Sequence, residues 1–262
     1  MKGCSALDVA DLRANPFAIL GVSPRDGRDR IGEALASRLL EADADEELLH
    51  RAHQRLMAPR SRLQAEAAWL LGLAPSHVET ILSTLRSQSA IALSVELNGT
   101  GGLARANLAA QLAIMYPDDS VLDHLIGAYD AIDPDQVGEI VNTERVVAGF
   151  PMTERGLVEE ALDHVRSRHL EAALAALERV EHPGLLMTRL VEERLAAEGG
   201  ARDFVQALAT RYDSWSAPLL GKLEECLDAA IARLRAEATD AAACVHWHTR
   251  SRTGTNTVSP AS

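Results

Sequence analysis

The sequence predicts an all-α protein, followed at its end by a disordered tail. Alanine, leucine, glutamate and arginine dominate, and this composition favours helix. Aromatic residues make up only 3% of a chain that is 47% hydrophobic, so the core must be built from aliphatic side chains. Glycine and proline cluster at breaks between stretches whose apolar residues recur at steps of three and four. At 262 residues, the chain can bury a sizeable core in one large or two small domains.

Composition and breaks divide the chain into four parts. Residues 1–14 hold a short apolar-periodic piece that we interpret as a lead-in. Residues 15–97 form the first helical domain, and the three glycines of 98–102 mark the expected boundary. Residues 103–238 form an irregular helical bundle. Residues 239–262 lose apolar periodicity and gain Thr, Ser, Asn and His, which predicts the disordered tail.

The first domain opens with Asn15-Pro16-Phe17-Ala18-Ile19-Leu20-Gly21-Val22, a short apolar turn of helix closed by a glycine. Ser23 is a candidate helix cap and Pro24 suits the first helical position, so a helix is expected to begin at Pro24. After the acidic break Asp43-Ala44-Asp45, a second helix is expected to carry apolar residues from Leu48 to Leu70. The pattern predicts two antiparallel helices joined by a tight loop.

These residues resemble a J-domain, the helical module of DnaJ-type co-chaperones. The resemblance covers about sixty residues and combines Phe17-Ala18-Ile19-Leu20-Gly21-Val22, the helix after Ser23-Pro24, and a "Leu-x-x-Pro-x-x-Arg" run at Leu56, Pro59 and Arg62. The family's His-Pro-Asp tripeptide, which stimulates Hsp70 ATPase activity, belongs where this chain has Asp43-Ala44-Asp45. The resemblance therefore implies an interaction module that does not stimulate an Hsp70 by the usual route.

Seven residues of this module are candidates for binding a protein partner. The resemblance places Arg28, Arg30 and Arg38 on the solvated face of the second J-like helix, where the family docks on an Hsp70. The remaining four are Asp43 and Asp45 in the loop and Arg51 and Arg55 on the next helix. A mixed-charge helix surface is also what an ordinary soluble helix shows, so both readings stay open. The carboxylates around Asp43 lack the frame of a calcium loop and are more simply explained as a helix start.

The later helices are expected between clear stops. Ser76 and Glu79 form a capping box for a helix running to about Val95. Asp133 caps a helix with Pro134 at its first position. The longest helix should span about residues 154–180, and the last about 218–238 after a stop at 214–218.

Charge and motifs limit the function classes. The net charge is −12, which disfavours nucleic acid and anionic membrane as partners. Three dispersed cysteines and the lack of an apolar run of about 20 residues predict a cytoplasmic protein without disulfides or a membrane span. Cys244, His246 and His248 alternate in the tail but lack a fourth ligand, so no metal or other cofactor is expected.

No nucleophile elbow, phosphate-binding loop or dinucleotide fingerprint occurs, so an enzyme is the least favoured class and no catalytic residue is proposed. We expect a protein-interaction module or atypical co-chaperone, whose partner is a protein and possibly an Hsp70-type chaperone. The alternative is a subunit or scaffold of a multi-protein defence or assembly complex. The sequence does not determine the oligomeric state.

Overall fold

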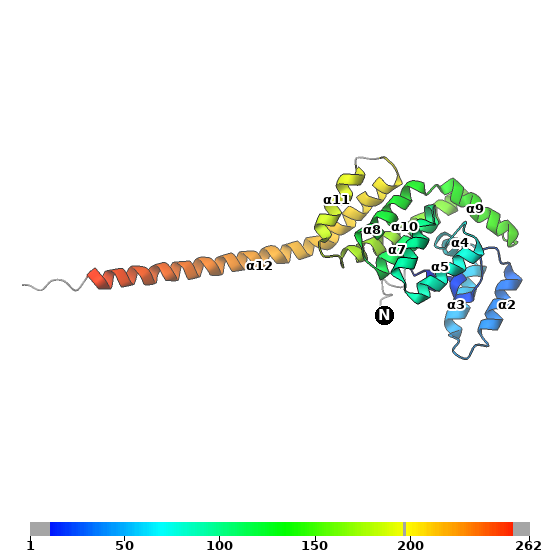
Figure 1. Ribbon diagram of the computed structural model, residues 1–262, viewed down its shortest axis with the longest axis horizontal. Coiled ribbons are helices and arrows are strands. Elements are labelled where there is room, and N and C mark those ends of the chain that lie inside the picture. The colour runs from blue at the N-terminus through cyan, green and yellow to red at the C-terminus, as the bar shows by residue number, and fades with distance from the viewer. Residues whose placement is uncertain (1–10, 196–197, 254–262) are drawn as a thin grey trace, which may run out of the picture. The chain divides into compact units, whose positions relative to one another are not determined.

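The computed structural model describes residues 11–195 and 198–253, and within them it contains twelve α-helices, two short 3₁₀ helices and no strand (Figure 1). In chain order these are η2 (Leu12–Ala14), α1 (Pro16–Leu20), α2 (Arg28–Arg38), α3 (Glu46–Met57), α4 (Pro59–Ala67), α5 (Pro75–Ser87), α6 (Ala90–Asn98), α7 (Gly102–Met115), α8 (Asp119–Ala128), η3 (Tyr129–Ala131), α9 (Pro134–Val147), α10 (Arg155–Leu177), α11 (Pro183–Leu195) and α12 (Gly200–Thr253). The all-α prediction is confirmed.

The chain forms two units, Met1–Thr210 and Arg211–Ser262. Within the first unit, α4 and α7 both pack on α10. Leu63 of α4 and Leu103 of α7 therefore belong to one hydrophobic cluster with Val165 of α10. The glycine-rich residues 98–102 connect α6 to α7 inside this unit. The expected boundary at 98–102 consequently does not separate two compact units, because the two sides share a core.

The helix expected from Pro24 begins instead at Arg28, with Gly27 as its N-cap. Residues 23–26 form a turn, in which the Ser23 backbone N–H donates to Asp26 Oδ2 at 2.6 Å and the Asp26 N–H donates to the Ser23 carbonyl. The Pro24 carbonyl accepts a hydrogen bond from Arg62 Nη2 at 2.8 Å. The start at Pro24 was wrong because a distant arginine and a local side chain use the groups that a first helical turn would have needed.

Two expected helices are each divided in two. The run from Leu48 to Leu70 breaks at Ala58, which adopts an extended conformation because the next residue, Pro59, disfavours helix for the residue before it. The helix expected from Ser76 to Val95 breaks at Gln88, whose φ is +53° and whose carbonyl accepts from the Tyr116 hydroxyl. Ser76 lies inside α5 and caps nothing, because the helix begins at Pro75.

Other helix boundaries agree with the sequence. The Asp45 side chain accepts from the Leu48 backbone N–H at 2.9 Å and so caps α3. The Asp133 side chain accepts from the Asp135 N–H and caps α9, with Pro134 at the first position. Helix α10 occupies most of the expected residues 154–180. Local capping chemistry therefore predicted these starts correctly.

Helix α12 corrects one prediction, because it passes through Pro218 without the stop expected at 214–218. It ends at Thr253, and the disorder expected for residues 239–262 stays a prediction. Gly254 is the first glycine after Gly221, so no strong helix breaker occurs between them. The rest of the tail, residues 254–262, lies outside the described residues, as do the side chains of Cys244, His246 and His248.

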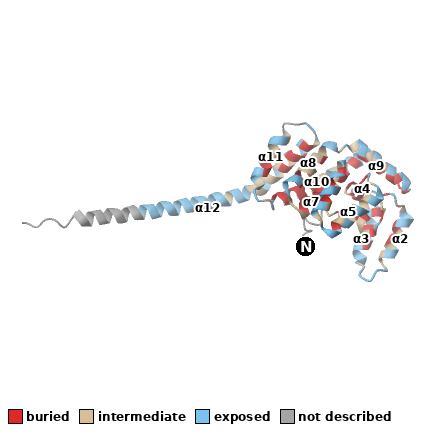
Figure 2. Ribbon diagram, in the orientation of Figure 1, coloured by how far each residue is buried: buried red, intermediate tan, exposed pale blue. Residues whose placement is uncertain are grey.

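Burial differs along α12 (Figure 2). Ala201, Phe204 and Leu208 are buried within the first unit. A side chain at Gly200 would collide with the Tyr129 carbonyl, because a Cβ built there lies 2.3 Å from that oxygen. From Leu219 to Leu234 the large apolar side chains are exposed, as the pale blue ribbon shows.

Candidate functional site

A buried ionic cluster holds the amino-terminal helices to the rest of the first unit. Arg62 and Glu66 of α4 are completely buried, and Arg62 Nε donates to Glu66 Oε1 at 2.8 Å. Arg145 of α9 donates from Nε to Glu66 Oε2, also at 2.8 Å. Burial raises the pKa of the Glu66 carboxyl, whereas both guanidinium groups act in the opposite direction. We call Arg62, Glu66 and Arg145 the ionic hub.

The hub joins the residues that carry the sequence resemblance. The Arg62 guanidinium lies 5.5 Å from the centre of the Phe17 ring and 3.7 Å from that of the Phe150 ring. It also binds the Pro24 carbonyl. Arg62, Phe17 and Pro24 thus meet in the interior, which gives this part of the motif a structural role.

The three arginines of α2 that were predicted to bind a partner differ in exposure and in neighbours. Arg28 is exposed at the start of the helix, and its guanidinium lies 5.3 Å from the centre of the Phe150 ring. Arg30 is exposed and pairs with Glu33 at 3.4 Å. Arg38 is only half-exposed: it pairs with Glu41 at 3.1 Å and lies beside Gly21. The three arginines therefore have different surroundings, and Arg38 is the one nearest to α1; a shared role in partner binding stays a prediction.

The other four candidates also occupy separate positions. Asp43 is exposed in the α2–α3 connection, and Asp45 is used as the cap of α3. Arg51 is exposed and pairs with Glu47 one turn earlier. Arg55 lines a small pocket between α3 and α10. The structure therefore does not gather the seven residues into one cluster, and Arg55 belongs to a second candidate site.

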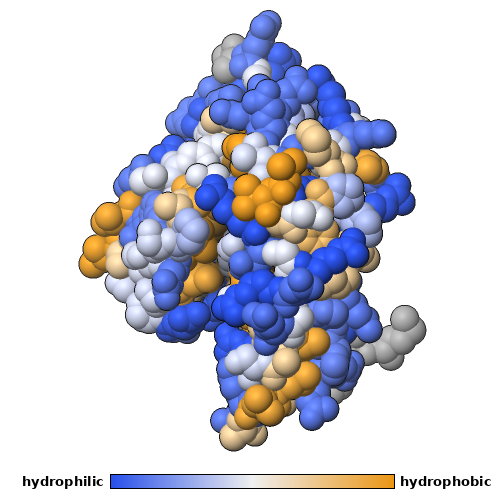
Figure 3. Space-filling model, turned by 90° about the vertical axis from the view of Figure 1, so that its right-hand side faces the viewer, coloured by the Kyte–Doolittle hydropathy of each residue, from blue (hydrophilic) through white to orange (hydrophobic). Residues whose placement is uncertain are grey.

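A groove of about 510 Å³ lies beside the hairpin. Apolar side chains from α1, α5 and the α4–α5 connection line it, including Phe17, Trp69 and Leu82. Arg38 and Arg86 also line it, opposite acids such as Glu79. On the face shown in Figure 3, apolar side chains form separate orange patches within a hydrophilic surface.

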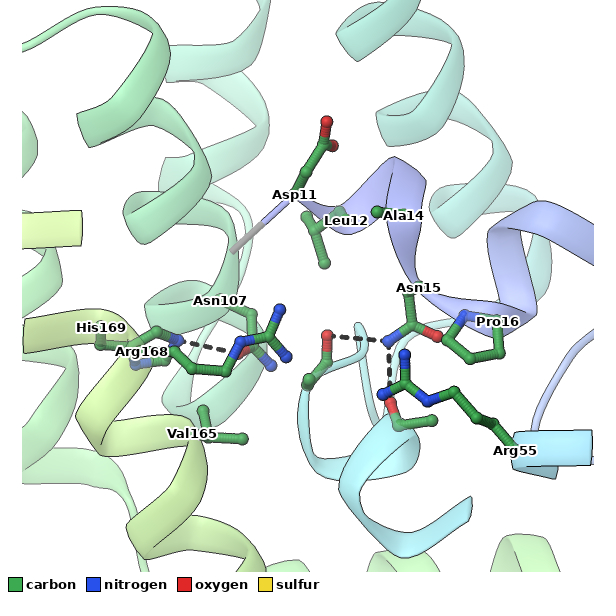
Figure 4. A pocket seen from close by; sticks show the side chains of 12 residues that line it. Asp11, Leu12, Ala14, Asn15, Pro16, Arg55, Asn107, Val165, Arg168 and His169 are labelled. Carbon is green, nitrogen blue, oxygen red and sulfur yellow. Dashed lines mark hydrogen bonds between the residues drawn. The ribbon is translucent and has the colours of Figure 1, made fainter. Parts of the chain in front are cut away.

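The pocket that contains Arg55, here called the basic pocket, has a volume of about 50 Å³ and is shown in Figure 4. Its polar wall includes His169 and Asn107, both buried. The Asn107 amide nitrogen donates to the Ala67 and Trp69 carbonyls, so its Oδ1 is the acceptor that faces His169 Nε2 at 2.9 Å. His169 therefore carries its proton on Nε2, and Nδ1 accepts from the Tyr129 hydroxyl at 2.9 Å.

Burial, followed by the nearby Arg168 charge, lowers the pKa of His169 to about 3. Burial also raises the pKa of Tyr129. Both side chains stay neutral near pH 7 and satisfy one another, which is the behaviour of structural polar groups. Nothing local in the sequence predicts this network, because its members come from α7, η3 and α10.

The described part of the chain lacks two further features. No group of three or more His, Cys, Asp or Glu side chains there is placed to hold a metal ion. None of the helices described there is both long enough and apolar enough to cross a membrane.

Comparisons with known proteins identify no relative. No protein-family model, curated protein or solved structure matches the chain.

Proposed function

We propose that the protein is a non-catalytic protein-interaction module, an atypical co-chaperone in which the α2–α3 hairpin binds the partner. The observation that carries the proposal is how the charges of this hairpin are paired. Among the residues that the structure describes, Arg30, Arg38 and Arg51 form ion pairs only with Glu33, Glu41 and Glu47 of the same hairpin. Their charged groups are not used to hold other helices, so a partner can replace these local pairs at small cost.

The end of the hairpin adds an apolar contact. Leu40 follows α2 and is 88% exposed, and Leu48 at the start of α3 is partly exposed. Leucine beside arginine is a suitable composition for a small protein-binding surface. The hairpin packs on its neighbours through α3, which contacts α1 and α4, and the buried hub binds the Pro24 carbonyl just before α2.

The test uses an Hsp70-type chaperone from the same organism. We expect the protein to bind it, and binding to weaken when Arg30→Glu is combined with Leu40→Ser, while helical circular dichroism and melting stay unchanged. Arg60→Glu on α4 is a matched control, since Arg60 is also exposed and pairs with a glutamate. Single-turnover ATP hydrolysis should not accelerate, because the His-Pro-Asp tripeptide is missing.

Each outcome of this test has a defined meaning. A several-fold acceleration of hydrolysis would overturn the expected lack of stimulation. Failure to bind would exclude the co-chaperone form of the proposal. Equal loss of binding in the control variant would show that overall charge, and not the hairpin, determines binding.

A second candidate function, a scaffold subunit, is favoured by helix α12. Six large apolar side chains on it are 37–64% exposed: Leu219, Leu220, Leu223, Leu227, Ile231 and Leu234. Steps of three and four place them along one side of the helix, as in a coiled coil. An isolated helix with such a stripe gains stability when a partner covers it.

The charges of α12 favour a second copy of the same helix in antiparallel orientation. Glu224, Glu225 and Asp228 precede Arg233 and Arg235, so antiparallel pairing brings acids opposite arginines. We expect a dimer by sedimentation equilibrium that becomes monomeric when Leu223→Gln and Leu227→Gln are combined. Ala232→Gln, on the opposite side of the helix, is the control and should remain dimeric. A monomeric wild-type protein would exclude this assembly.

A further inference from the structure

The basic pocket brings together two arginines from different helices. Arg55 comes from α3 and Arg168 from α10, and both line the pocket. Figure 4 shows their guanidinium groups turned toward the interior from opposite sides. Burial lowers the pKa of Arg168, and the charge of Arg55 lowers it further. The two like charges are therefore close enough to repel.

Neither arginine has a hydrogen bond or ion pair with any described residue. The other polar groups of the pocket are already occupied. Asp11 binds Arg13 through both carboxylate oxygens. Asn15 donates to the Ala65 and Ala68 carbonyls and accepts from the Phe17 N–H. The pocket thus offers two guanidinium groups and no free carboxylate to neutralise them.

The neighbouring His164 of α10 responds to the same two charges. Its pKa is lowered by burial and then by Arg168 and Arg55, so its imidazole is neutral near pH 7. Burial also lowers the pKa of Arg55. Glu171, on the same helix as Arg168, acts on Arg168 and His164 in the opposite direction but forms no ion pair with either. Arg55 is exposed and Arg168 is half-buried. Two unpaired like charges that line one pocket repel, and a ligand that supplies negative charge compensates this repulsion.

We propose that the basic pocket binds a small dianionic oxyanion of the phosphate type through Arg55 and Arg168. Guanidinium groups form paired, charge-assisted hydrogen bonds with phosphate oxygens, and two groups facing one another match the two charges of a phosphate. The volume of about 50 Å³ corresponds to a few water molecules, which suits a phosphate group and excludes a nucleotide. The bound group would bridge α3 to α10.

The first experiment measures inorganic phosphate binding by isothermal titration calorimetry at constant ionic strength. We expect one site in the whole protein, and a loss of affinity of about ten-fold or more in each of Arg55→Gln and Arg168→Gln, because each variant removes hydrogen bonds to a charged group. Arg51→Gln is the matched control, since it lies one turn before Arg55 on the same helix but outside the pocket. Sulfate should compete and acetate should not.

The second experiment separates specific binding from the general effect of salts and from failed folding. Thermal melting should rise with phosphate in the wild-type protein and in Arg51→Gln. Without phosphate, Arg55→Gln should melt at the same temperature as the wild type or higher, because one of two repelling charges is removed. Phosphate should then raise its melting temperature no more than sodium chloride does.

A third experiment, which compares the binding of phosphoserine and inorganic phosphate, identifies the source of the phosphate group. Phosphoserine and inorganic phosphate share the chemistry, so tighter binding of phosphoserine would indicate a phosphorylated ligand and tighter binding of inorganic phosphate a free ion. No heat of binding in the wild-type protein, or equal binding in Arg55→Gln and Arg168→Gln, would overturn the proposal. Equal binding of acetate would overturn the phosphate assignment. These outcomes are independent of whether the α2–α3 hairpin binds a chaperone.

Discussion

The ionic hub and the basic pocket each bring two arginines together in the first unit. The hub contains a carboxylate that both arginines bind, and the pocket does not. In the hub, Arg62 and Arg145 share Glu66 at 2.8 Å each. In the pocket, Arg55 and Arg168 share no acid among the described residues. The same side chain therefore joins helices in the hub, whereas in the pocket it has no counter-charge among the described residues, which is the basis of the proposed anion site. What decides its role is the neighbour that the fold supplies.

The largest effect is expected when the hub is made to resemble the pocket. Glu66→Gln keeps the size of the side chain but leaves two buried guanidinium groups without a counter-charge, and breaking a buried pair in this way costs about 3–5 kcal/mol. Urea unfolding should show a correspondingly lower free energy of unfolding. Glu47→Gln, which removes an exposed carboxylate paired with Arg51, is the control and should change stability little. Equal, small losses in both variants would show that the hub contributes no more than a surface ion pair.

The comparison also shows what the sequence could predict. Capping residues such as Asp45 and Asp133 act within one turn of helix, so their roles could be read from neighbouring residues. The partner of Glu66 in α9 lies 79 positions away, and nothing local in the sequence marks Arg145 as that partner. The seven partner-binding candidates remain predictions as binding residues, although their different surroundings show that they do not act as one cluster.

The apolar spacing in the sequence predicts only part of the burial that the structure shows. Ile31 and Leu56 are buried as their spacing suggests, whereas Leu40 and Leu48 sit at the hairpin end and are exposed. The stripe from Leu219 to Leu234 has the same helical spacing as that of α10, yet only α10 finds helices to cover it. Periodicity predicts which side of a helix is apolar, and it does not predict whether a second element covers that side.

A smaller effect is expected from pH at His169, the neutral buried base beside Arg168. Its folded pKa of about 3 lies below the usual value of about 6.5 for an unfolded chain. Well above pH 6.5 the histidine is neutral in both states and the stability is fully present. As the pH falls toward 3 the unfolded state takes up the proton first, so the free energy of unfolding decreases, by roughly 2–3 kcal/mol between pH 7 and pH 4.5.

The measurement is the slope of unfolding free energy against pH, in the wild-type protein and in His169→Gln. Other groups titrate in both proteins, so the difference between the slopes isolates the histidine. The variant should lose less stability on acidification than the wild type. Parallel slopes would show that His169 takes up its proton in the folded state as readily as in the unfolded state.

The smallest effect is expected on the surface, where a third kind of arginine is found. Arg30 is exposed and pairs with Glu33 three residues later on the same helix, at 3.4 Å. Water already screens both charges, so an exposed pair of this kind contributes a few tenths of a kcal/mol at most. Arg30→Ala should therefore change the free energy of unfolding by less than about 0.5 kcal/mol. A double-mutant cycle with Glu33→Ala measures the pair directly. A pair energy above about 1 kcal/mol would place Arg30 with the hub arginines, as a residue that the fold needs, and would weaken the argument that the hairpin keeps its charges for a partner.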